Sequence, residues 1–231
     1  MFNFLNLLKV FLVIMFLLFP FTSAFSKENN YSLKRIKELA VKFLKNFNLE
    51  AIDKIYNLLS QQEVVMGSRF TSTIPVLMPT GTVFYSHSEN SILIATKMKN
   101  SVINNVELLS EDGGVLFSVK DTSFSKRSFI FYPKLKGGKE YTIKVVALYL
   151  SPDKEVKETK KRDFVVITPA FNKNLAFLEK KLESIDAMKL AKKEKFLLKA
   201  IVFEDFSLKT GGLYDFSYNR DKYIYLFKNT N

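Results

Sequence analysis

The sequence predicts an α+β fold in which an antiparallel β-sandwich lies between two helical segments of the chain. Apolar residues recur at helical spacing before residue 60 and again in the last third of the chain. Between these regions, short β-rich runs alternate with Gly, Pro and Asp turn residues, as expected for an antiparallel sandwich. The 231 residues include no cysteine, so core burial must hold the fold together without disulfides.

Residues 1–24 have the layout of a secretory signal peptide. Lys9 precedes the apolar run Val10–Phe21, Pro20 interrupts this run, and small residues provide a cleavage site after Ala24 or two residues later. The run is shorter than the roughly 20 residues of a transmembrane helix. We therefore expect export to the periplasm or the extracellular space, with no permanent membrane span after cleavage. The alternative is an anchor formed by an uncleaved N-terminal segment.

Residues 25–66 are expected to form an N-terminal helical segment. Ser32 is positioned to cap a first helix, whose apolar residues share one face: Leu33, Ile36, Ala40, Phe43 and Phe47. Asn48 is expected to cap a second helix over about Leu49–Leu59. The pattern predicts a helix pair that packs on another part of the chain.

Residues 73–168 are expected to form the sandwich. Asp112-Gly113-Gly114, between two apolar runs, is a hairpin signal. The predicted strands are Pro75–Met78, Val83–Ser86, Ser91–Lys97, Asn105–Ser110, Val115–Lys120, Ser128–Tyr132, Tyr141–Leu150 and Asp163–Thr168.

One run within the sandwich is more specific. Leu135 stands six residues before Tyr141, Gly137-Gly138 lies between them, and alternating apolar residues follow. This run resembles the junction of strands E and F in fibronectin type III and related Ig-like domains. The resemblance implies an Ig-like topology and a tyrosine corner, in which the Tyr141 hydroxyl bonds to backbone near the turn. The sequence departs from that family in having Ile92-Leu93-Ile94 where a strand B tryptophan is expected.

Residues 169–231 are expected to form a C-terminal helical segment. Thr168-Pro169 predicts the start of a helix, with threonine as cap and proline in the first turn. Asp186 is expected to cap a second helix, which Gly211-Gly212 ends. A third helix is expected over Leu213–Phe227.

The sequence shows no catalytic or metal-binding motif. His87 is the single histidine and is expected in a solvated turn, because Ser86 and Ser88 point away from it on an extended chain. The acidic pairs Glu111-Asp112 and Glu204-Asp205 lack the ligand spacing of a calcium loop and are interpreted as a hairpin turn and a helix surface. We expect no catalytic residue, no cofactor and no metal, and a protein that is not an enzyme.

The chain is strongly basic, with 35 Lys and Arg against 23 Asp and Glu and a net charge of +12. The candidate surface for an anionic partner is a basic run in the predicted last hairpin: Lys157, Lys160, Lys161 and Arg162. No aromatic residues interleave this run, so nucleic acid is not expected as a partner. Because Lys is spread over the whole chain, simple solubilisation also accounts for the charge.

These observations predict an exported, non-enzymatic binding protein of the cell envelope. It is expected to act through protein–protein contacts of the Ig-like sandwich and its helices, with another envelope protein as partner. The alternative is an electrostatic binder of an acidic envelope polymer or lipid, and an enzyme is the third class. The helix–sandwich–helix order, with Gly67-Ser68-Arg69 ahead of the sandwich, resembles that of other exported bacterial proteins.

Overall fold

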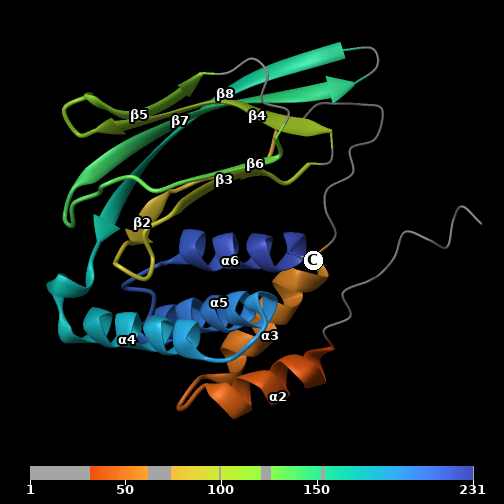
Figure 1. Ribbon diagram of the computed structural model, residues 1–231, viewed down its shortest axis with the longest axis vertical. Coiled ribbons are helices and arrows are strands. Elements are labelled where there is room, and N and C mark those ends of the chain that lie inside the picture. The colour runs from red at the N-terminus through yellow and green to blue at the C-terminus, as the bar shows by residue number, and fades with distance from the viewer. Residues whose placement is uncertain (1–31, 62–73, 99, 121–125, 152–153, 231) are drawn as a thin grey trace, which may run out of the picture. The chain divides into compact units, whose positions relative to one another are not determined.

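The computed structural model describes residues 32–61, 74–98, 100–120, 126–151 and 154–230 (Figure 1). The predicted signal peptide, residues 1–24, and the Gly67-Ser68-Arg69 turn lie outside these ranges. Within them, no helix combines the length and the apolar character needed to cross a membrane.

The fold is α+β, with two β-sheets and a set of helices drawn from both ends of the chain. The helices are α2 (Leu33–Phe43), α3 (Leu49–Ser60), α4 (Lys173–Ala187), α5 (Lys192–Lys209), α6 (Ser217–Asn229) and the single 3₁₀ turn η1 (Pro169–Phe171). The strands are β1 (Val76–Leu77), β2 (Gly81–Phe84), β3 (Ile92–Thr96), β4 (Ser101–Ser110), β5 (Val115–Lys120), β6 (Ser128–Phe131), β7 (Glu140–Ser151) and β8 (Lys154–Ile167).

The two sheets differ in strand direction. The three-stranded sheet, in the order β1-β3-β6, is antiparallel. The five-stranded sheet, in the order β2-β8-β7-β4-β5, is mixed because β2 runs parallel to β8, from the pair Gly81–Phe164 to the pair Phe84–Ile167. The prediction of a wholly antiparallel sandwich is therefore wrong at this edge. After β1, the turn at Pro79–Gly81 moves the chain to the other sheet, and Gly81 takes the left-handed φ of 62°.

The sheets pack face to face over one apolar core in a sandwich-like arrangement, which Figure 1 shows in side view. On β7, the side chains of Tyr141, Ile143, Val145 and Ala147 are buried, whereas those between them are partly exposed. This alternation is the one predicted for a half-buried strand. The core takes residues from both sheets: Leu77, Ile92, Ile94, Phe131, Val83, Val106, Leu108, Phe164 and Val166.

The Tyr141 ring closes one end of this core. Its hydroxyl accepts a hydrogen bond of 2.8 Å from the backbone N–H of Lys136, in the turn that precedes β7. The ring stacks on Phe164 at a centroid distance of 5.7 Å, and Leu135 packs against the core. The tyrosine therefore connects the turn to the buried face of the five-stranded sheet.

The N-terminal helices begin where the sequence predicts. Asn48 caps α3, and its Oδ1 accepts a hydrogen bond of 2.9 Å from the N–H of Glu50. The Asn48 cap and the apolar face of α2 are both local features, with buried Ile36 and Ala40 on that face. The spacing of residues in the sequence is therefore sufficient to predict both the cap and the apolar face.

The C-terminal helices differ from the prediction at their ends. Thr168-Pro169 starts only the short turn η1, and Asn172 instead caps α4 by accepting a hydrogen bond of 3.0 Å from Leu175 N. Asp186 lies in the last turn of α4 and does not cap α5, because its carboxylate pairs with Lys199 at 2.8 Å. Leu213 is 75% exposed and precedes α6, since the left-handed Gly211 and Gly212 place it in a turn.

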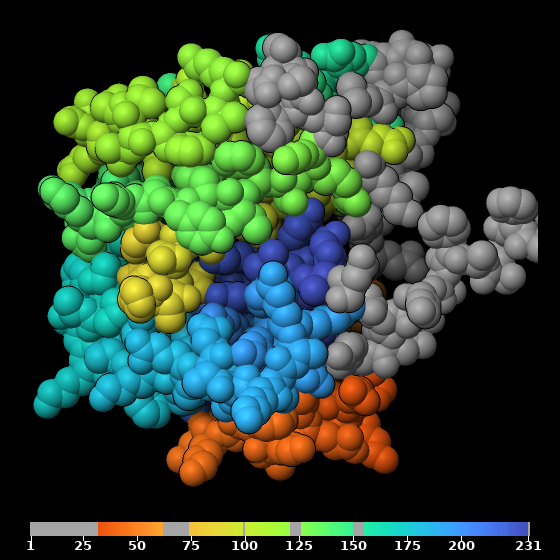
Figure 2. All heavy atoms as spheres, in the orientation of Figure 1, coloured from red at the N-terminus to blue at the C-terminus, as the bar shows by residue number. Residues whose placement is uncertain are grey.

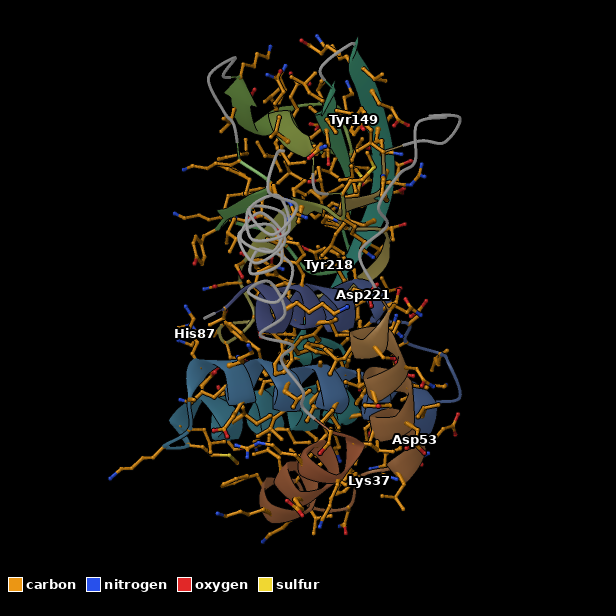
Figure 3. The ribbon with its side chains drawn as sticks, turned by 90° about the vertical axis from the view of Figure 1, so that its right-hand side faces the viewer. Lys37, Asp53, His87, Tyr149, Tyr218 and Asp221 are labelled. Carbon is orange, nitrogen blue, oxygen red and sulfur yellow. The ribbon has the colours of Figure 1, made fainter. Side chains whose placement is uncertain are left out.

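Helix α6 joins the helices to both sheets through two adjacent side chains. Asn219 pairs with both backbone groups of Phe84 on β2: its Oδ1 accepts from Phe84 N and its Nδ2 donates to Phe84 O, each at 2.9 Å. The Tyr218 hydroxyl accepts from Leu93 N at 2.8 Å and donates to Leu93 O at 3.1 Å. Figure 3 shows Tyr218 between α6 and the strands. Asn219 takes the place of a neighbouring strand beside the edge strand β2, and Tyr218 does so at Leu93, in a part of the central strand β3 with which β1 does not pair.

We predict that Asn219→Ala lowers the free energy of unfolding by about 3 kcal/mol, because the buried N–H and C=O of Phe84 lose their partners. Urea-induced unfolding measures this change. The matched control Asn57→Ala, at an exposed position of α3, should stay within about 0.5 kcal/mol of the wild type. Equal stability of the two variants would contradict the role given to α6.

Candidate functional site

Among the described residues, the most deeply buried ion pair lies where α6 meets the sheets. Glu89 is 1% exposed and Lys222 is 2% exposed, and the two form an ion pair. Lys222 Nζ also donates to the backbone and side-chain oxygens of Ser91, at 2.7 and 2.8 Å. The other Glu89 oxygen accepts from the Tyr223 hydroxyl, whose pKa is raised well above its usual value by burial. Both carboxylate oxygens therefore serve to hold α6 in place.

The residues around the single histidine are also used for packing. His87 is exposed and lies at the periphery of the molecule in Figure 3. Ser88 Oγ donates to Glu179 Oε2 at 2.8 Å, and Ser86 Oγ accepts from Glu89 N at 3.1 Å. The hydroxyls are thus bonded to a carboxylate and to backbone, and this arrangement prepares neither serine as a nucleophile.

The predicted basic surface divides between the two faces of a strand. Lys157, Lys160, Lys161 and Arg162 all lie in β8, which begins at Lys154 and not near Asp163 as predicted. Lys157 and Lys161 point away from the core, because strand residues alternate. Lys160 lies on the opposite face and forms an ion pair with Glu158 at 3.0 Å. The four residues are not brought together as one patch.

A cleft lies between the helices. It has a volume of about 750 Å³ and is bounded by the turn between α2 and α3 and by α4 and α5. Figure 2 shows these elements meeting in the lower half of the molecule, in orange for α2 and α3 and in cyan to blue for α4 and α5. Its lining includes the apolar residues Phe43, Leu44, Phe177, Leu178, Met188, Val202 and Phe206.

Asp205 is the buried carboxylate of this cleft, with 2% of its surface exposed. Its Oδ1 accepts a hydrogen bond of 2.7 Å from the backbone N–H of Asn48, 157 residues away in the sequence. Its Oδ2 pairs with Lys209 Nζ at 2.9 Å and with Lys181 Nζ at 3.7 Å. One carboxylate therefore connects the N-terminal helices to α5 and neutralises part of the charge of two lysines.

The turn between α2 and α3 forms one wall of the cleft. Asn46 is the single non-glycine residue with positive φ among the described residues, at 53°. Asparagine tolerates this conformation better than most residues. The Lys209 ammonium donates to the carbonyl oxygen of Asn46, which holds the turn against α5. The wall is thus positioned by contacts within the protein.

Lys181 lines the cleft from α4 and is partly buried. Burial lowers the pKa of its ammonium, the positive charge of Lys209 lowers it further, and the Asp205 carboxylate opposes both effects. Its Nζ lies 5.1 Å from the centroid of the Phe177 ring, in cation–π geometry. The cleft therefore has a partly desolvated cation beside an apolar wall.

This cleft is not among the features predicted from the sequence. The prediction that Glu204-Asp205 lies on a helix surface is wrong, because both side chains are buried and Glu204 binds Arg220 at 2.7 Å. The lining residues come from two distant regions of the sequence, so no local motif contains them. The sequence contains only a weak local indication of the cleft: two acidic residues stand inside an otherwise apolar stretch of α5.

The sequence matches no protein-family model and no curated protein. Part of the chain is similar to solved fibronectin(III)-like modules of Clostridium thermocellum CbhA, with 19% identity, a TM-score of 0.24, and coverage of 42% of this chain and 98% of the module. The E. coli chaperone DraB shares 13% identity at a TM-score of 0.25, over 43% of this chain and 57% of DraB. Bacteroides uniformis beta-glucuronidase 2 shares 14% identity at a TM-score of 0.19, over 42% of this chain and 11% of that enzyme. At TM-scores this low, these likenesses carry no argument about topology or function.

We predict that Asp205→Asn lowers the free energy of unfolding by about 2 kcal/mol, because Lys181 and Lys209 lose a buried counter-charge while the shape of the side chain is kept. Asp53→Asn is the matched control, since Asp53 pairs with Lys37 at 3.4 Å on the surface and should change stability by less than about 0.5 kcal/mol. Chemical unfolding of both variants gives the comparison, and a neutral Asp205→Asn would contradict the structural role of this carboxylate.

Proposed function

We propose that this is an exported, non-enzymatic binding protein of the cell envelope, and that the cleft between the helices is its binding site. The observation that carries the proposal is the cleft itself, with a volume of about 750 Å³, apolar walls and a buried carboxylate–lysine group. Small-ligand sites commonly occupy roughly 300–1,000 Å³ and combine apolar walls with a few polar groups. Export is supported by the signal-like layout of residues 1–24.

The two sheets serve in this proposal as an Ig-like, fibronectin type III-like scaffold. The hydrogen bond from Lys136 N to the Tyr141 hydroxyl and the buried alternation of β7 support that assignment. The scaffold positions α6, and α6 and α5 together position the walls of the cleft. Another envelope protein remains the expected partner, and it would contact the outer rim of the cleft, where Phe177 is 58% exposed, while the cleft itself holds a small ligand.

Capture from an envelope fraction tests this proposal. Ser184 lines the cleft from an exposed position of α4, so Ser184→Trp should fill it without disturbing the core. Glu183→Trp, exposed on the same helix and outside the cleft lining, is the matched control. Molecules retained by the wild type should be lost with Ser184→Trp and kept with Glu183→Trp, as identified by mass spectrometry. A wild type that retains nothing reproducibly, or a Ser184→Trp variant that retains the same set, would refute the proposal.

The electrostatic alternative is favoured by one observation on the five-stranded sheet. Lys144 on β7 stands directly opposite Lys161 on β8, and Lys157 lies four residues away on the same outward face. Positive charges at this spacing form a surface that attracts an anionic polymer or lipid electrostatically.

In this alternative, the double variant Lys157→Glu/Lys161→Glu should lose binding to vesicles that contain phosphatidylglycerol, whereas Lys189→Glu, an exposed lysine between α4 and α5, should retain more of it. Co-sedimentation at rising salt provides the second readout, because exposed charges are screened beyond about 10 Å at 0.1 M salt. Vesicle binding that is unchanged at high salt would exclude the electrostatic surface.

A further inference from the structure

The charges of the cleft are unbalanced. Three lysines line it, Lys45 at the turn, Lys181 on α4 and Lys209 on α5, and Asp205 is the single carboxylate among its described lining residues. Lys209 is closely paired, at 2.9 Å from Asp205. Lys45 is exposed at the rim. The lining therefore has more positive than negative charge, and this favours an anionic group.

The Lys181 ammonium can still donate hydrogen bonds to a ligand in the cleft. An ammonium has three donors. Its distance to Asp205 Oδ2, 3.7 Å, exceeds the length of a normal hydrogen bond, and Nζ makes no other ion pair among the described residues. With 24% of the side chain exposed, the lysine is only partly solvated. An anion that enters the cleft would supply the acceptor that Asp205 does not reach.

Apolar surface continues directly from this cation. The Phe177 ring lies within 5.1 Å of Lys181 Nζ, and Leu178, Val202 and Phe206 continue the wall along α4 and α5. Phe177 is largely exposed although it is a large aromatic side chain. A ligand that fits both features has an apolar chain joined to an anionic head.

We propose that the cleft binds a single-chain amphiphilic anion, an acyl or alkyl chain with a carboxylate or phosphate head, and that Lys181 binds the head together with Lys209. The inference rests on the proposed function, in that it takes the cleft to be the binding site and adds the class of its ligand. Asp205 is a positioning residue here, because it holds Lys209 and the α2–α3 turn and would not touch the head group.

The same walls disfavour an extended peptide as the occupant. Two sides of the cleft are the helices α4 and α5, whose backbone groups are bonded within the helices. Extended peptides gain much of their affinity from backbone hydrogen bonds to an open strand edge. A flexible chain needs only the apolar contacts that this cleft offers.

Isothermal titration calorimetry on the full chain, below the critical micelle concentration, tests the inference. The probes are dodecanoate and dodecyl phosphate, with 1-dodecanol as the uncharged chain and acetate and inorganic phosphate as heads without a chain. We expect one dodecanoate or dodecyl phosphate per protein, with weaker binding of dodecanol and of the free heads. Comparing the two anions distinguishes a carboxylate ligand from a phosphate ligand.

Two variants locate the site. Lys181→Met removes the charge and keeps an unbranched side chain that is one atom shorter, and it should weaken dodecanoate binding by about tenfold or more, as for loss of a charge-assisted hydrogen bond. Lys180→Met, at the exposed neighbouring position on α4, removes the same charge outside the cleft and should leave the affinity unchanged. Ser184→Trp should abolish binding of both anions.

The outcomes that overturn the inference are separable from failure of the proposed function. If dodecanol binds as tightly as dodecanoate and Ser184→Trp blocks both, the cleft is a binding site but not for an anion. If Lys181→Met and Lys180→Met bind dodecanoate equally, Lys181 does not hold the head. If inorganic phosphate binds as tightly as dodecyl phosphate, the apolar wall has no role. If neither dodecyl anion binds, the ligand class is wrong, and the capture experiment with Ser184→Trp still decides the proposed function.

Discussion

Two adjacent side chains of α6 fasten the helices to both β-sheets. Asn219 bonds both backbone groups of Phe84 in the five-stranded sheet, and Tyr218 bonds both backbone groups of Leu93 in the three-stranded sheet. A buried backbone group without a partner is costly, so loss of the helix would expose these backbone groups of Phe84 and Leu93 or leave them unsatisfied. The ion pair of Glu89 with Lys222 is buried at the same junction.

The constraint continues from the sheets to the cleft through aromatic rings. The Phe84 ring contacts Phe203 of α5 at 6.0 Å and Phe216, just before α6, at 5.6 Å. Two residues after Phe203, α5 carries Asp205, which bonds to Asn48 at the start of α3. A strand of the sandwich, the C-terminal helices and the N-terminal helices are thus joined in one series of contacts. The cleft is preformed because this series of contacts holds its walls, and preformed walls reduce the entropy lost on binding.

Local patterns could be predicted from the sequence, and long-range contacts could not. The Asn48 cap, the alternation after Tyr141 and the α+β class depend on neighbouring residues, so spacing was sufficient. The start of β8 was missed because residues 154–162 are mostly charged and show no apolar alternation, although they pair with β7. Tyr218 and Asn219 bond to residues 125 and 135 positions away, and no local signal marks such partners. Asp205 was missed for the same reason.

We propose that the cleft between α4, α5 and the α2–α3 turn binds the ligand of this protein. A crystal structure of the complex with dodecanoate would locate the bound chain and head group. We expect density for the alkyl chain along Phe177 and Phe206, with the carboxylate within hydrogen-bonding distance of Lys181 Nζ. Dodecanoate bound elsewhere, for example along Lys144 and Lys161 on the outer face of the sheet, with an empty cleft, would show that the cleft is not the binding site.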